Sequence, residues 1–169
     1  MKFWESFDQN EVILLIMTGI AYLVYFLLSR KPNNLAPQIR ILSLLWGLTI
    51  GVLYDFTIGG GQTDFYRVND LNNYEVTDVI YYLLFAPFGY FFFYFYERFR
   101  ISKKTFILYV LVWALLGVAF QWLLTKAGIL TMQNGYRLAH SFPIFLFTQT
   151  ITGIYIQLLK AKEQVWAVE

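Results

Sequence analysis

The chain contains no cysteine and only one histidine among its 169 residues. The lack of cysteine excludes disulfide bonds, thiolate metal sites and a thiol nucleophile. No basic patch interleaved with aromatic residues is present, so we expect no nucleic-acid partner. The glycine run at residues 59–61 is not followed by Lys and Ser or Thr, which a phosphate-binding P-loop requires. No cofactor fingerprint is recognisable, and we predict no cofactor.

Long apolar runs are what the sequence has in abundance. Five of them cover residues 12–28, 41–57, 79–96, 106–124 and 143–159. A helix rises ~1.5 Å per residue, so each run is about long enough to cross a hydrocarbon core of ~30 Å. We therefore predict an all-α membrane protein, a bundle of five transmembrane helices forming a single domain over residues 1–169. Five spans do not divide into two equal halves, which argues against the inverted-repeat designs of transporters.

The positive charges are distributed unevenly between the two sides of this predicted bundle. One side would carry four basic residues, namely Lys2, Arg67, Lys126 and Arg137. The opposite side would carry the other nine: Arg30, Lys31, Arg40, Arg98, Arg100, Lys103, Lys104, Lys160 and Lys162. Because cytoplasmic loops carry the excess of Lys and Arg, the side with nine is predicted to be cytoplasmic. The N-terminus is then outside and the C-terminus inside.

A stripe of small and polar residues runs along the second span. Its members recur every four residues and therefore lie on one side of a helix: Ser43, Gly47, Gly51, Asp55 and Gly59. Gly47 and Gly51 form a GxxxG pair, which allows the backbone of another helix to approach closely. The favoured interpretation is close packing, either within the bundle or between two copies in a homo-oligomer.

The segment between the fourth and fifth spans carries a turn signal. Asn134-Gly135 separates two short mixed runs, residues 129–133 and 136–140, and this dipeptide is typical of a tight β-hairpin. We predict a small outer β-hairpin between helices 4 and 5, with a re-entrant or helical segment as the alternative. Ser141 before Pro143 is predicted to begin the fifth helix.

Aromatic residues make up 21% of the chain. Tyr and Trp favour the membrane–water interfaces, and Phe is an apolar side chain that suits contact with lipid. The densest aromatic cluster, residues 88–96, runs around the whole third helix. We therefore expect much of this cluster to face lipid, in preference to a pigment pocket or a stacking surface.

Asp55 is the residue most suggestive of a site, because a carboxylate within hydrocarbon is costly unless it is paired, hydrated or protonated. It is predicted to face the bundle interior and to engage Arg137, Lys126 or His140, directly or through water. The outer half of the bundle supplies the candidate ligand-binding residues Asp55, Asp78, His140, Arg137, Gln121 and Tyr54. Three interpretations stay open: a structural ion pair, a binding or translocation site, or catalysis with His140 as base. No ligand spacing supports a metal, so none is predicted.

Three segments resemble a known group of proteins. They are residues 126–142, with their Asn134-Gly135-Tyr136-Arg137 turn, Leu53-Tyr54-Asp55, and residues 78–87. Together they resemble an uncharacterised family of small multi-pass membrane proteins of spore-forming Gram-positive bacteria. The resemblance implies a location in the bacterial plasma membrane. It implies no activity, because the family has none assigned.

Two functions fit the sequence. The leading hypothesis is a non-enzymatic membrane protein with an outward-facing polar cavity that binds a small polar ligand, an ion or a lipid headgroup. Such a protein would also suit a role as subunit of a membrane assembly. The alternative is a small membrane enzyme that acts on a lipid or isoprenoid substrate at the outer leaflet. No second histidine, cysteine or paired-acid motif supports the enzyme.

Overall fold

The protein is a bundle of five long helices, seen in a computed structural model that describes residues 9–31, 35–59, 63–68 and 76–166. The helices are α1 (Gln9–Ser29), α2 (Pro37–Tyr54), α3 (Val76–Arg98), α4 (Phe106–Lys126) and α5 (Leu138–Trp166). A π-helical turn, η1 (Asp55–Gly59), extends α2. All five helices are long and apolar enough to cross a membrane, which confirms the predicted five-span bundle.

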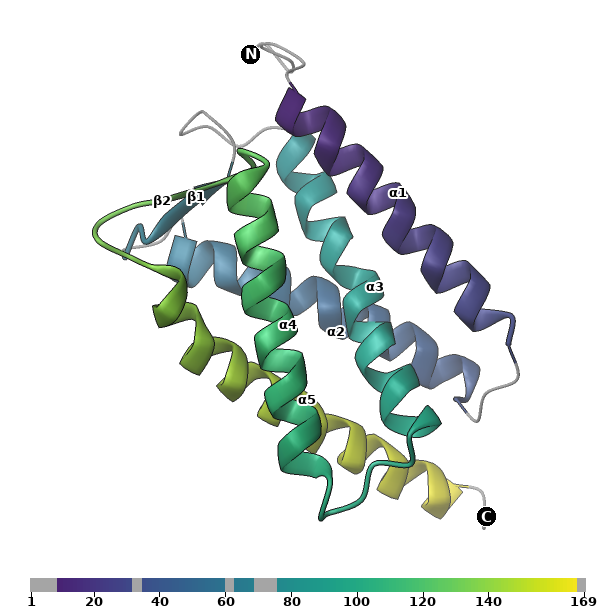
Figure 1. Ribbon diagram of the computed structural model, residues 1–169. Helices are drawn as coiled ribbons and strands as arrows, with labels where there is room; N and C mark the ends of the chain where they lie inside the picture. Colours follow the sequence, from purple (N-terminus) through teal and green to yellow (C-terminus); the bar gives the residue numbers. More distant parts are fainter. Residues whose placement is uncertain (1–8, 32–34, 60–62, 69–75, 167–169) are drawn as a thin grey trace.

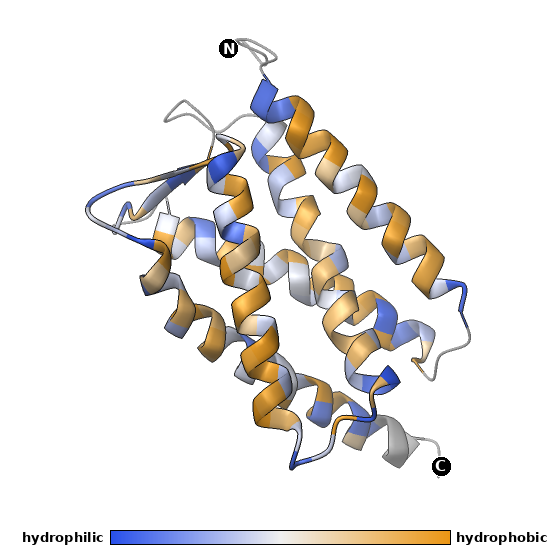
Figure 2. Ribbon diagram, viewed as in Figure 1, coloured by the Kyte–Doolittle hydropathy of each residue, from blue (hydrophilic) through white to orange (hydrophobic). Residues whose placement is uncertain are grey.

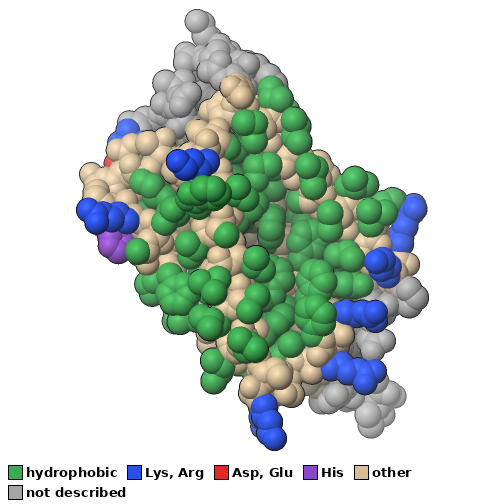
Figure 3. All heavy atoms as spheres, in the orientation of Figure 1, with side chains coloured by type: hydrophobic (Ala, Val, Ile, Leu, Met, Phe, Trp, Pro, Cys, Tyr) green, Lys and Arg blue, Asp and Glu red, His purple; other side chains and the backbone are tan. Residues whose placement is uncertain are grey.

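Hydropathy and charge vary along the bundle as they do in a membrane protein. The middle parts of the helices are mostly hydrophobic, and hydrophilic residues gather near their ends (Figure 2). On the face shown in Figure 3, hydrophobic side chains occupy the middle and Lys and Arg lie toward the two ends. Large apolar side chains such as Ile16, Leu27 and Ile107 are more than half exposed. In water such a surface would aggregate, whereas in a bilayer it faces lipid tails.

Helix α3 is the central element of the bundle. It lies between α1 and α4, and α2 also packs along it (Figure 1). Its aromatic residues are therefore buried on every side, including Tyr90, Phe92, Phe93 and Tyr94. The prediction that much of residues 88–96 faces lipid was wrong. Composition did not reveal it, because an all-round apolar helix suits the centre of a bundle as well as a lipid environment.

Helices α2 and α3 pack through their backbones. Every member of the Ser43–Gly59 stripe is buried. A Cβ atom on Gly47 would lie 2.8 Å from the amide nitrogen of Gly89 on α3, and one on Gly89 would overlap the carbonyl oxygen of Ser43. The close packing predicted for Gly47 and Gly51 is thus confirmed, and it occurs within one chain.

Helices α4 and α5 form the second closely packed pair. In this pair the glycines contact aromatic rings, whereas Gly47 and Gly89 between α2 and α3 contact backbone. Gly117 on α4 lies against Phe145, and Gly153 on α5 lies against Phe106. The molecule therefore has two parts, α1–α3 and α4–α5, each held together by its own close contacts.

A two-stranded antiparallel sheet joins these two parts at one end of the bundle (Figure 1). Strand β1 (Tyr66–Val68) precedes α3, and strand β2 (Leu130–Met132) lies between α4 and α5. Tyr66 pairs with Met132, and Val68 pairs with Leu130. A small sheet was correctly predicted here, but its second strand is β1 and not residues 136–140.

The Asn134-Gly135 turn itself forms as the sequence indicates. Asn134 and Gly135 have φ angles of +49° and +74°, and the amide of Tyr136 donates to the carbonyl of Gln133 over 2.9 Å. Both central residues of a type I′ turn require positive φ. The chain then enters α5 at Leu138, so residues 136–140 form no strand and Ser141 does not begin the helix.

Candidate functional site

A cavity of about 410 Å³ lies between the two parts of the bundle. Helices α2 and α3 line it on one side, and α4 and α5 line it on the other. Its surface is formed mostly by large apolar and aromatic side chains, for example Phe85, Phe88, Trp113 and Phe120. No residue of this lining carries a charge. The lining thus differs from the outward-facing polar cavity that the sequence led us to expect.

Large aromatic side chains keep α3 and α4 apart and so create this cavity. Ring pairs span the gap, with centroids 4.6 Å apart for Phe88 and Phe120 and 5.4 Å apart for Phe92 and Trp113. Farther from the sheet, the hydroxyl of Tyr109 donates to the backbone carbonyl of Phe92 over 2.5 Å. These tilted ring pairs hold the two helix backbones apart, whereas glycines between α2 and α3 bring two backbones together.

The cavity has an opening on the flank of α4. Three of its lining residues, Leu116, Ala119 and Leu123, are exposed. They occur on one side of α4, within the central part of a helix long enough to cross the membrane. The opening therefore faces the depth at which a bilayer is hydrocarbon.

The end of the cavity next to the sheet, which we call the sheet end, is lined by Tyr54, Tyr66, Tyr81, Gln121 and Tyr136, and the polar residues Thr148, Gln149 and Thr152 of α5 also line the cavity. The side-chain oxygen of Gln121 is buried and has no hydrogen-bond partner within the described part of the chain. Leaving such an acceptor unpaired costs about 1–3 kcal/mol. By contrast, Tyr54 donates to the carbonyl of Ile144 over 3.4 Å.

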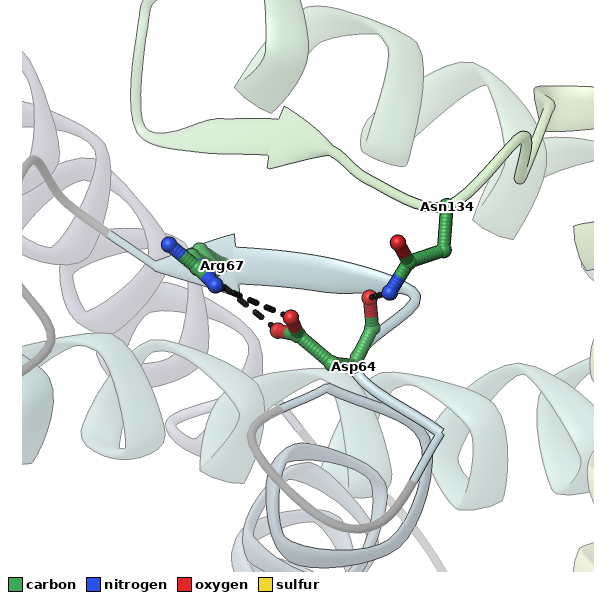
Figure 4. A network of polar contacts seen from close by, with 3 residues as sticks. All are labelled: Asp64, Arg67 and Asn134. Atoms are coloured by element: carbon green, nitrogen blue, oxygen red, sulfur yellow. Dashed lines mark hydrogen bonds and ion pairs between the residues drawn. The ribbon is translucent and has the colours of Figure 1, made fainter.

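The sheet covers this end of the cavity and is fastened by polar contacts. Arg67 binds both carboxylate oxygens of Asp64, at 3.2 and 2.9 Å, and Asn134 donates to the Asp64 carbonyl over 2.9 Å (Figure 4). The Arg67 guanidinium lowers the pKa of Asp64 below its usual range. The Phe65 ring stacks on Tyr136 at 5.1 Å, so the loop before β1 is attached directly to the turn before α5.

Asp55 is buried immediately behind the sheet end. Its carboxylate accepts a hydrogen bond of 2.5 Å from the hydroxyl of Tyr82 on α3. Among the described residues, Arg67 pairs with Asp64 and Lys160 pairs with Glu97, and Asp55 makes no direct ion pair with Arg137, Lys126 or His140. Asp55 itself does not line the cavity.

Tyr66 lines the cavity and lies beside Asp55. Its ring and the Asp55 carboxylate both lie about 3 Å from the position of a Cβ on Gly59. Burial is the main cause of a raised pKa of the Tyr66 hydroxyl, and the nearby Tyr81 and Asp55 raise it further. Asp55 thus lies next to Tyr66, one of the tyrosines that line the sheet end.

The remaining predicted site residues are not brought together with Asp55. Arg137 and His140 are exposed at the start of α5, where the backbone amide of Arg137 donates to Nδ1 of His140 over 3.1 Å. That contact caps the first turn of the helix. Asp78 is buried in the first turn of α3 and takes part in a further interaction. Within the described ranges, no three His, Asp or Glu side chains gather as a metal site would need.

Of the six candidate residues, the structure places Tyr54 and Gln121 in the cavity, together with the packing residues Gly47 and Gly51. Sequence reasoning missed the aromatic lining, including Phe85, Phe88 and Phe120. One signal could have revealed it, since Trp113, Gly117, Phe120, Gln121 and Leu124 share a face of α4 that mixes large, small and polar residues.

Searches against protein-family models, curated proteins and solved structures find no match to this chain.

Proposed function

We propose that this integral membrane protein binds an amphipathic, lipid-like molecule, whose apolar body occupies the cavity and whose head group donates a hydrogen bond to Gln121. The unpaired side-chain oxygen of Gln121 is the observation that carries this proposal. A buried acceptor without a partner is rare in proteins, and a ligand that supplies a donor explains why it is retained.

The size and the lining of the cavity support an apolar ligand body. A volume of about 410 Å³ lies within the range of ~300–1,000 Å³ typical of small-molecule sites. Such sites combine a mainly hydrophobic surface with a few polar groups that fix orientation, which describes this lining. The opening beside Leu116 and Leu123 allows a ligand to come from the bilayer. Binding requires only what the lining supplies, whereas the alternative lipid-modifying enzyme would need acid–base groups in contact with its substrate.

The orientation and the location belong to the same proposal. The bias of nine basic residues against four supports an N-terminus outside and a C-terminus in the cytoplasm. The sheet end of the cavity then lies in the outer half of the membrane. The family resemblance supports the bacterial plasma membrane. Because Gly47 and Gly51 pack within the chain, they supply no argument for a homo-oligomer.

Binding can be tested with the tryptophans of the cavity. Trp46 and Trp113 both line it, so a bound long-chain alcohol that carries a bromine on its tail should quench their fluorescence. We expect saturable quenching in phosphatidylcholine nanodiscs. Replacing Gln121 with Leu should weaken binding of the alcohol by about two- to tenfold, because the net value of a hydrogen bond is ~0.5–1.5 kcal/mol. The brominated alkane of equal length should bind wild type and Gln121→Leu equally.

A matched control is available at the other end of the bundle. Gln157 is exposed, bonds to Tyr96 and lies outside the cavity lining, so Gln157→Leu should leave alcohol binding unchanged. Quenching that rises linearly with the alcohol and never saturates, in wild type as in both variants, would show partition into lipid and would refute the proposal.

A further inference from the structure

Three different features of the sheet end favour the same kind of ligand head. The first is the hydrogen-bond acceptor on Gln121, which is buried and unpaired. The second is the set of tyrosine rings, since Tyr54, Tyr66, Tyr81 and Tyr136 all contribute to the lining. The third is Asp55, whose carboxylate is buried beside Tyr66. Each of these groups interacts well with a cation that carries N–H bonds.

The tyrosine rings contribute through their faces. An ammonium group within ~6 Å of an aromatic ring is attracted by the ring quadrupole, and the interaction strengthens to ~2 kcal/mol when the site is desolvated. Sites that recognise ammonium groups are commonly built from several aromatic rings around one position. Four tyrosines line this end of the cavity, so several aromatic rings are available to an ammonium group there.

The buried carboxylate lacks a cation of its own within the described residues. The ion pairs found there involve Asp64 and Glu97, and the Asp55 carboxylate accepts a hydrogen bond from the neutral Tyr82. The basic residues Lys126 and Arg137 at this end of the bundle are exposed, and neither lines the cavity. In surroundings of low dielectric, a negative charge acts across a longer distance than it does in water. The sheet end is therefore the part of the cavity where a positive charge is most favourable.

We propose that the head group of the ligand is cationic, so that the protein binds a lipophilic amine or a related amphipathic N–H cation at the sheet end. The ammonium group donates to Gln121, contacts the tyrosine rings and is attracted by Asp55 beside Tyr66. This inference rests on the proposed function, because it specifies the head group of the same ligand.

The test compares three probes of equal chain length, namely dodecylamine, dodecanol and dodecanoate, as competitors of the brominated alcohol in phosphatidylcholine nanodiscs. An alkylamine is protonated near neutral pH, as is lysine with a pKa of about 10.4. We expect dodecylamine to compete about tenfold more strongly than dodecanol, and dodecanoate to compete least. Asp55→Asn should reduce the preference for the amine over dodecanol to less than about threefold.

Asp64→Asn is the matched control, because it removes a carboxylate at the same end of the bundle but outside the cavity lining. This variant should keep the full preference for the amine. Equal competition by amine and alcohol in wild type would overturn the inference and leave the proposed function standing. A preference that persists in Asp55→Asn would also overturn it. If Asp55→Asn fails to fold, the order of the three probes on wild type decides. Failure of the alcohol itself to bind would refute the proposed function instead.

Discussion

Helix α3 packs against α2 and against α4 in two different ways. Toward α2, Gly47 and Gly89 bring the two backbones into contact. Toward α4, Phe88 and Phe92 meet the rings of Phe120 and Trp113 across a gap. In a membrane, association depends on packing and on polar contacts, because lipid tails are as apolar as the side chains. The first interface therefore gives the bundle its cohesion, and the second keeps space for a ligand.

Introducing a large side chain into the glycine interface should have the largest effect. Gly89→Leu places a Cβ atom against the backbone of Ser43 and Gly47. Backbone atoms cannot move aside by changing a rotamer, so the overlap persists. We expect destabilisation by more than about 2 kcal/mol, at the upper part of the range for overpacking. Thermal unfolding in detergent, followed by circular dichroism, measures it. Gly19→Leu is the control, because no atom lies within 4 Å of that Cβ position. Equal melting temperatures for the two variants would contradict the backbone contact.

Removing the unpaired acceptor of the cavity should have a smaller effect of opposite sign. Gln121→Leu replaces a buried side chain, whose oxygen lacks a hydrogen-bond partner, with an apolar side chain of similar size. The free energy of unfolding of the ligand-free protein should rise by about 1 kcal/mol. Together with weaker binding, this gain in stability distinguishes a site retained for function from a structural residue. A loss of stability would indicate that Gln121 has a structural partner.

Obstructing the opening of the cavity should have the smallest effect on the free energy of unfolding. Leu116 lines the opening and is 52% exposed, so Leu116→Trp should change the free energy of unfolding by no more than about 0.5 kcal/mol. The larger ring should nevertheless obstruct the cavity and reduce saturable quenching by the brominated alcohol. Ile107→Trp, on a lipid-exposed position of the same helix outside the lining, serves as the control. Normal binding by Leu116→Trp would mean that ligands enter elsewhere.

The sequence was sufficient for the parts of the fold that depend on local patterns. Span length follows from apolar runs, and the contact face of α2 follows from the four-residue spacing of Ser43, Gly47 and Gly51. The Asn134-Gly135 turn was likewise correct in its backbone conformation. Each of these features is encoded within a few neighbouring residues.

The errors and omissions concern partners that are distant in the sequence. Strand β2 pairs with β1, which lies two long helices earlier, and a turn signal beside β2 does not identify that partner. Asp55 binds the neutral Tyr82, which a search for charged partners did not identify. The aromatic residues of α3 are buried because three other helices surround it, and apolar composition is the same for burial in protein and exposure to lipid.

The location of the two strands has a consequence for synthesis. Strand β1 lies in the connection between α2 and α3, and β2 lies in the connection between α4 and α5. Each half of the molecule contributes only one side of the cavity, and the pairing of β1 with β2 covers its end. A nascent chain that has produced α1, α2 and α3 therefore contains Asp55 and two of the four lining helices, but no enclosed site. The proposed binding site is therefore complete only when the last two helices have been translated and inserted.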